Sequence, residues 1–142
     1  MGVLEDQAAI VRQTFHLAWI LDHRAWDRAG EALAADAVAY GCHGLESVVR
    51  DSFRQHLGGC GPSMHLLSNH VVDLDPSDPD RAVSRCYARV YHQGAGERSA
   101  KAWECWGEYH DEWARTPDGW RMTARRFDVT IASGDFDVLQ PG

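Results

Sequence analysis

The first third of the chain carries apolar residues at helical spacing. Val11, Phe15 and Ala18 recur at intervals of four and three residues, which predicts a helix over residues 5–22 with one apolar stripe. Asp22 continues this spacing. We therefore expect its carboxylate at the end of the stripe that faces the core.

Two further helices are predicted before the pattern changes. A short helix fits residues 26–35, and a longer one fits residues 45–57, where Val48, Phe53 and Leu57 would face inward. The sequence "GGCGPS" follows and ends the third helix, because glycine and proline interrupt helical hydrogen bonding.

After Pro62, apolar and polar residues alternate, which is the pattern of half-buried β-strands. The turn sequences "DPSDPD", "GAGE" and "TPDG" divide this part of the chain. Strands are therefore predicted over residues 64–74, 81–93, 99–115 and 119–132.

Strict alternation also assigns side chains to faces. On the first predicted strand, His65 and Asn69 would share one face, and His70 would lie on the other. The second predicted strand has one face of small or apolar residues that ends at His92, while its other face is bulky and amphipathic. We expect the face with small residues to line the interior.

Helices followed by a run of antiparallel strands are typical of the α+β class. Strands this long, with few interruptions, indicate strong curvature of the sheet, which can then enclose a pocket against the helices. We expect one cone-shaped α+β domain over residues 1–142, in which N-terminal helices pack on a strongly curved, mainly antiparallel sheet that encloses a pocket.

The composition of the chain argues against some classes of binding partner. The net charge of −7 argues against nucleic acid and anionic membranes, which both need basic surface. The start "MGVLEDQAAIVRQ" has acids where a signal peptide needs basic residues, and no apolar run approaches the roughly 20 residues of a membrane span. We expect a cytoplasmic protein whose four cysteines are free thiols.

Four segments in order carry a resemblance to a known family: "LDHRAWD", "AYG", "MHLLSN" and "RVYHQ". Together with the "DGW" turn and the C-terminal "FDVTIASGDFDV", they resemble the scytalone dehydratase-like and SnoaL-like branch of the nuclear transport factor 2-like superfamily. The resemblance covers nearly the whole chain. It implies a single SnoaL-like domain that carries out acid–base chemistry without a cofactor.

The resemblance implies catalytic roles for four residues. Asp22 matches the aspartate that closes the first helix and holds a histidine, which corresponds here to His65. His92 matches the second catalytic histidine, and Tyr40 matches a tyrosine that helps to hold a carbonyl-polarising water. A second water-holding tyrosine of such dehydratases is replaced here by Leu21.

The chemistry of the Asp–His pair supports these roles independently. A carboxylate that accepts a proton from one imidazole nitrogen fixes the tautomer and makes the other nitrogen more basic. An unperturbed histidine has a pKa of about 6.5, so it can act near neutral pH first as a base and then as an acid. Elimination of water needs both steps.

The first prediction is therefore a dehydratase that acts on a small cyclic or polyketide-like molecule. A SnoaL-like cyclase or isomerase, a dehydrohalogenase and a non-catalytic ligand-binding module remain as alternatives. Besides the four catalytic residues, the residues expected to shape the pocket are Asn69, Glu108, His110, Trp19, Phe53, Trp103 and Trp106.

The segment "WGEYHDEW" also suggests a metal site, because Glu108, His110 and Glu112 would share one face of a strand. Neighbours on one face of a strand are about 7 Å apart, and no second histidine accompanies them, so we predict no metal and no cofactor. The expected partner is a small molecule. We also expect a homodimer or homotrimer that associates through the outer face of the sheet, with Tyr87 and Tyr91 in the interface.

Overall fold

The computed structural model describes residues 2–142, which form helices and a single curved sheet. The N-terminal half contains α1 (Val3–Asp22), η1 (Trp26–Glu31), β1 (Leu33–Ala39), β2 (Cys42–His43), α2 (Leu45–Ser47), η2 (Val48–Phe53) and α3 (Arg54–Leu57). The C-terminal half contains β3 (Ser63–Leu74), β4 (Arg81–Gln93), η3 (Gly96–Arg98), β5 (Ala102–Thr116), β6 (Gly119–Gly134) and η4 (Phe136–Val138).

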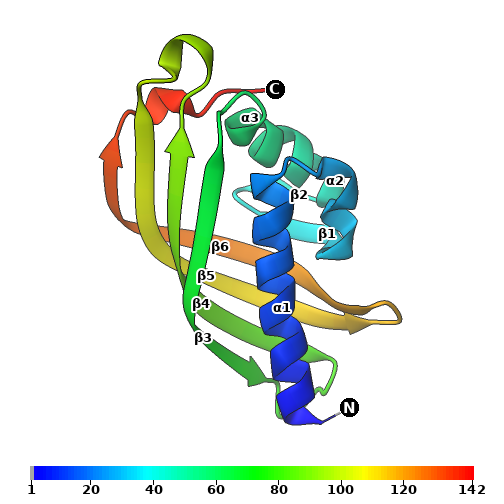
Figure 1. The fold of residues 1–142 in the computed structure, drawn as a ribbon. Helices are drawn as coiled ribbons and strands as arrows, with labels where there is room; N and C mark the ends of the chain where they lie inside the picture. Colours follow the sequence, from blue (N-terminus) through cyan, green and yellow to red (C-terminus); the bar gives the residue numbers. More distant parts are fainter. Residues whose placement is uncertain (1) are drawn as a thin grey trace.

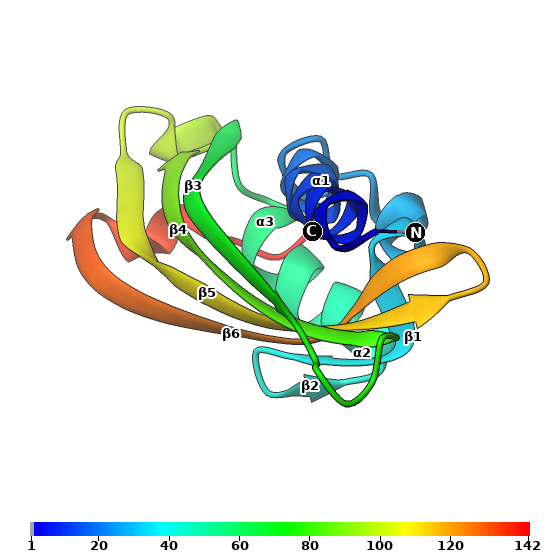
Figure 2. The same ribbon diagram turned by 90° about the horizontal axis from the view of Figure 1, so that it is seen from below.

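The sheet has the strand order β2-β1-β6-β5-β4-β3. Neighbouring strands are antiparallel except for β1 and β6, which run parallel. The long strands curve strongly, α1 crosses the concave side, and α3 and η4 lie near one end of the concavity (Figure 1). This is the α+β architecture that the sequence predicts, with the helices inside the curve of the sheet (Figure 2).

The helices over residues 5–22 and 45–57 and the four long strands are confirmed within three residues at each end. The predicted helix over 26–35 is wrong in its second half. A short 3₁₀-helix ends at Glu31, and Leu33–Ala39 forms a strand beside β6. The alanine-rich sequence favours a helix locally, but pairing with a distant strand decides the conformation.

The third predicted helix contains a six-residue π-helical segment, Val48–Phe53, between two short α-helical pieces. Such segments are frequent at functional sites, because the wider turn changes which side chains face the core. Here it buries the adjacent residues Ser52 and Phe53, and both line the cavity described below.

The buried stripe of α1 is offset from the predicted one. Ile10, Thr14 and Leu17 are almost completely buried, whereas Phe15 is 48% exposed. The helical period of 3.6 residues allows both stripes, and packing against β3 selects between them. Asp22 nevertheless bonds to the start of β3 with its side chain 14% exposed, so its carboxylate faces the interior as predicted.

A β-bulge in β3 reverses its faces. The pairing with β4 shifts between Ser68 and Val71, and Asn69 adopts a left-handed conformation with φ of 57°. Before the bulge His65 faces inward, and after it His70 does, whereas Asn69 is exposed. The predictions that His65 and Asn69 share a face and that His70 lies on the opposite one are therefore wrong, because a bulge breaks the period of two.

Small side chains on the inner face of β4 leave space inside the sheet. Ala82, Ser84, Cys86 and Ala88 are buried in alternation with exposed residues, as predicted. Large residues such as Trp113 fill the end of the sheet nearest the start of α1. The other end, towards His92, keeps an open volume. No helix within residues 2–142 is long and apolar enough to cross a membrane.

A buried ion pair joins the two central strands. Arg125 on β6 donates to Asp111 on β5 through two hydrogen bonds, 2.7 Å from Nε and 2.9 Å from Nη2. Their side chains are 2% and 1% exposed. Removing one partner of such a pair leaves an uncompensated charge in the interior.

We therefore expect Asp111→Ala to lower the free energy of unfolding by about 3–5 kcal/mol. The matched control is Asp128→Ala, which removes the exposed pair with Arg126 and should cost less than about 1 kcal/mol. Urea unfolding followed by circular dichroism measures both. Equal losses in the two variants would show that the buried pair carries no special stability.

Candidate active site

A cavity of about 240 Å³ lies between the helices and the curved sheet. This is below the roughly 300–1,000 Å³ of drug-sized ligand pockets, so the occupant is small. The residues that line it come from most elements of the fold: Leu21, Tyr40, Ser52, Phe53, His56, Leu57, His65, Val90, His92, Trp103, Cys105, Tyr109, Phe127, Val129, Phe136 and Leu139.

Asp22 ends α1 and receives three hydrogen bonds from the start of β3. Its Oδ1 accepts from His65 Nδ1 at 2.6 Å and from Ser63 Oγ at 2.9 Å. Its Oδ2 accepts from the backbone N–H of His65 at 2.8 Å. Burial raises the pKa of the Asp22 carboxyl, but the bonds from His65 and Ser63 outweigh it and hold the pKa below its usual range.

This bond fixes the chemistry of the His65 ring. Because the Asp22 carboxylate can only accept, the proton of neutral His65 lies on Nδ1, and Nε2 carries a free lone pair. The side chain is 6% exposed and lines the cavity. Asp22 and His65 thus form a preassembled pair whose free nitrogen can take a proton.

His92 lies across from His65, with the two ring centroids 6.4 Å apart. Its Nδ1 donates to the carbonyl oxygen of Trp103 at 3.0 Å. Burial lowers the pKa of His92 to about 4, so the ring is neutral at pH 7. With its proton on Nδ1, its Nε2 can only accept a hydrogen bond.

Two phenols occupy another part of the cavity wall. Tyr40 has φ of 52° and, with Gly41 at 77°, makes the two-residue turn between β1 and β2. Tyr109 packs on the guanidinium of Arg125, whose Cζ is 3.6 Å from the ring centroid. Burial raises the pKa of both phenols, so each stays protonated and can donate a hydrogen bond.

The structure thus brings Asp22, His65, His92 and Tyr40 to one site, and Phe53 and Trp103 also line its wall. The sequence reasoning missed Ser52, His56 and Tyr109. Strand alternation predicts the burial of Tyr109, which shares a face with Cys105. For Ser52 and His56 the π-helical segment removes any simple periodic signal.

Glu108, His110 and Trp106 do not line this cavity, and their prediction as pocket residues is wrong. They lie on the outer face of β5, because the residues between them face inward. His110 Nε2 is 3.6 Å from Glu108 and 3.4 Å from Asp128. The indole of Trp106 is 41% exposed.

Trp19 and Asn69 also lie outside the cavity, contrary to the prediction. Trp19 is 43% exposed on the outer side of α1, where its ring stacks on His23 with centroids 4.2 Å apart. Asn69 forms the bulge of β3. Within residues 2–142, no group of three or more His, Cys, Asp or Glu side chains is arranged to hold a metal ion.

Comparison with protein families finds one match, to the SnoaL-like domain over residues 2–126. A search of curated proteins finds no match. Among solved structures, the chain is similar to a candidate aromatic ring hydroxylase from Novosphingobium aromaticivorans, with 24% identity and a TM-score of 0.84, covering 97% of this chain and 99% of that one.

Two other similar structures have names that indicate elimination chemistry. A candidate scytalone dehydratase from Novosphingobium aromaticivorans has 18% identity and a TM-score of 0.79, covering 92% of this chain and 87% of that one. A hexachlorocyclohexane dehydrochlorinase, LinA type 2, has 15% identity and a TM-score of 0.79, covering 92% and 89%. At these identities the likeness establishes the fold.

The low pKa of His92 predicts a pH-dependent stability. Between pH 6.5 and about 4 the unfolded chain binds a proton at His92 that the folded protein does not, so acidification favours unfolding. The wild type should lose up to about 3 kcal/mol of unfolding free energy across this window from this residue. His92→Gln should lose correspondingly less.

Urea unfolding at pH 7 and at pH 4.5 measures the difference, with His43→Gln as the control at an exposed position. An identical pH dependence in wild type and His92→Gln would contradict the buried, neutral state of this ring.

Proposed function

Since the chain belongs to the SnoaL-like domain family, within the nuclear transport factor 2-like superfamily, we propose that it is a cofactor-independent dehydratase of a small cyclic molecule. The observation that carries the proposal is the bond of 2.6 Å between Asp22 and His65, with the free nitrogen of His65 in the cavity wall. A binding module needs no such buried pair.

In the proposed reaction His65 Nε2 removes a proton from a substrate carbon next to a carbonyl. Asp22 stabilises the imidazolium that forms, in the way that a buried carboxylate supports a histidine base. The same imidazolium then returns the proton to the departing hydroxyl, which leaves as water. One histidine therefore acts on one face of the substrate in both steps.

His92 supports a substrate that carries a hydroxyl. Its Nδ1 is occupied by the Trp103 carbonyl and its ring is neutral, so Nε2 can accept a hydrogen bond from a hydroxyl but cannot donate one. A chloride offers no proton to accept. This favours dehydration over dehydrohalogenation, although the Asp–His pair would serve both.

The cavity wall also restricts the substrate. Among the described residues that line it, none is Asp, Glu, Lys or Arg. Aromatic residues provide much of the wall, including Phe53, Trp103, Phe127 and Phe136. A neutral, ring-shaped compound such as a small polyketide-derived hydroxy ketone fits this environment, and the phenols of Tyr40 and Tyr109 can donate to a carbonyl oxygen.

A cyclase or isomerase would use the same base and remains the second candidate. The acceptor-only His92 favours dehydration, because ring closure or isomerisation does not require release of a hydroxyl. The product distinguishes them directly, since dehydration lowers the substrate mass by one water.

The test is Asp22→Asn assayed on a panel of neutral cyclic hydroxy ketones, by the absorbance and mass of the conjugated product. An amide cannot stabilise an imidazolium, so we expect kcat/KM to fall at least about 100-fold while the fold is retained. Asp36→Asn, at an exposed position on β1, is the matched control and should keep wild-type activity. Full turnover by Asp22→Asn would rule out the proposed mechanism.

We further propose that the protein forms a homodimer through the outer face of its sheet. This face exposes seven large apolar side chains, each 41–60% accessible: Met64, Leu66, Val83, Tyr87, Tyr91, Trp106 and Ile131. Apolar surface of this extent on a folded protein indicates an interaction site.

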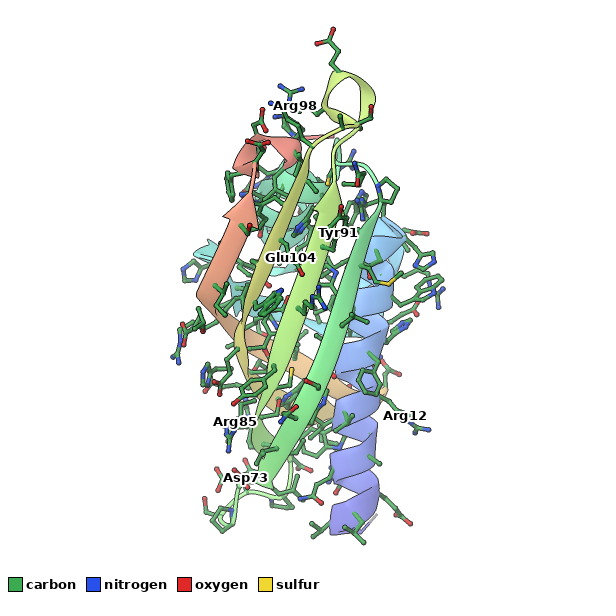
Figure 3. The ribbon with its side chains drawn as sticks, turned by 60° about the vertical axis from the view of Figure 1, so that its left-hand side comes forward. Arg12, Asp73, Arg85, Tyr91, Arg98 and Glu104 are labelled. Carbon is green, nitrogen blue, oxygen red and sulfur yellow. The ribbon has the colours of Figure 1, made fainter. Side chains whose placement is uncertain are left out.

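The charged residues on the outer face of the sheet favour a second copy of this chain as the partner. The outward residues of β4 include Arg81, Arg85 and Arg89, and the adjacent outward residues of β5 include Glu104, Glu108 and Glu112. Arg89 and Glu104 pair within the chain at 2.6 Å, which leaves two arginines and two glutamates for contacts with a partner. Figure 3 shows Arg85, Tyr91 and Glu104 on this face. A two-fold axis parallel to the strands and between β4 and β5 would place each basic stripe over the partner's acidic stripe.

Sedimentation velocity tests this arrangement through a charge exchange. Arg85→Glu should raise the dissociation constant of the dimer at least tenfold, because it sets an acid against the partner's glutamates. Adding Glu108→Arg in the same chain should restore association. A wild-type monomer or trimer, or no recovery in the double variant, would contradict the two-fold arrangement.

A further inference from the structure

Arg24 lies two residues beyond Asp22 in an unusual backbone conformation. Its φ of 54° falls in the left-handed region, which is strained for a residue with a side chain. This conformation lets the side chain reach back beneath the Asp22–His65 pair. A strained conformation indicates a specific purpose for the side chain.

The guanidinium of Arg24 connects three segments around the pair. It donates to the carbonyl oxygens of Leu21, Leu57 and Gly61 at 2.8, 2.8 and 2.6 Å. It also donates to Ser63 Oγ at 2.8 Å, and more weakly to the carbonyl of Asp22 at 3.3 Å. These bonds fix the end of α1 against the beginning of β3.

Within residues 2–142, Arg24 has no carboxylate at ion-pair distance. The guanidinium is connected to the Asp22–His65 pair through the hydroxyl of Ser63 instead. Arg24 donates to Ser63 Oγ, and Ser63 in turn donates to Asp22 Oδ1, which also accepts from His65. The four residues form one chain of hydrogen bonds that begins with a fixed positive charge.

We propose that Arg24 is a positioning residue that keeps the proton of the pair on His65 and the negative charge on Asp22. The inference rests on the proposed base role of His65. A bond of 2.6 Å brings the carboxylate close enough to compete for the imidazolium proton during the reaction. The positive charge of Arg24, which lies beyond Ser63, disfavours the neutral acid form of Asp22. The proton therefore stays on His65 and can return to the substrate.

The same charge also acts on the second histidine. Burial is the main cause of the low pKa of His92, the bond to the Trp103 carbonyl raises this pKa, and the positive charge of Arg24 lowers it. The titratable or charged groups around the pair, from every element that packs against it, are Arg24, Tyr40, His56, Cys60, His92, Cys105 and Tyr109. Arg24 is the permanently charged member of this set.

Two variants separate the charge of Arg24 from its hydrogen bonds. Arg24→Gln removes the charge, whereas Arg24→Lys keeps it but loses the planar fork that contacts several carbonyls. Histidine ring titration by NMR reads the pKa of His92 directly and requires no substrate. We expect this pKa to rise by a measurable fraction of a pH unit in Arg24→Gln and to stay near its wild-type value in Arg24→Lys. Arg12→Gln, at an exposed position on α1 that points away from the sheet (Figure 3), is the control.

Ser63→Ala provides a milder test if Arg24→Gln does not fold. It removes the hydroxyl that links Arg24 to Asp22 and leaves the guanidinium in place. We expect the carboxyl pKa of Asp22, followed by ¹³C NMR, to rise, and the acid limb of the activity profile to move to higher pH.

An unchanged His92 pKa in folded Arg24→Gln, or an unchanged Asp22 pKa in Ser63→Ala, would overturn the proposal and leave Arg24 as a structural clamp. Both pKa measurements are independent of catalytic turnover. If no dehydration is detected while the two pKa values shift as expected, the proposed function fails and the assignment of Arg24 stands.

Discussion

The hydrogen bond between Asp22 and His65 is the constraint on which the candidate site depends. It joins the last residue of the first helix to the start of the first long strand, which are separated by four short helical elements and the β1–β2 hairpin. The backbone N–H of His65 binds the second carboxylate oxygen, so the ring and the main chain are fixed together. The carboxylate therefore orients the nitrogen proposed as the base and also closes the helices onto the sheet.

Among residues 2–142, three residues with side chains adopt left-handed backbone conformations, and two of them lie beside this site. Arg24 turns back under the pair, Tyr40 forms the tight turn that brings its phenol to the cavity, and Asn69 forms the bulge that reverses β3. Conformations of this kind cost free energy and persist where the surrounding structure requires them. Tyr40 lines the cavity and Arg24 is bonded to Ser63 beside the Asp22–His65 pair, which is the pattern expected when local strain maintains a functional arrangement.

The alternation of side chains on β4 and β5 separates two surfaces of opposite character. Towards the helices, small residues and aromatic rings make an uncharged cavity that can keep His92 neutral. Towards the outside, the same two strands carry stripes of arginine and glutamate between exposed aromatic rings. Because successive residues point to opposite faces, the proposed chemistry and the proposed association occupy the same strands without sharing a side chain.

The sequence by itself determined the α+β class and the long helix and strands, because helices and alternating strands follow from local spacing. The resemblance to a known family, carried by four short segments, pointed to Asp22, His65 and His92 as candidate catalytic residues, and the structure places them around one cavity. The tertiary structure alone decided the strand Leu33–Ala39, the positions of Ser52 and His56 in the cavity wall and the contact of Arg24 with Ser63. It also placed Asn69, Glu108, His110, Trp19 and Trp106 outside the cavity. Each of these depends on a bulge, a register or a contact between distant segments, and one extra residue in a strand is sufficient to exchange its faces.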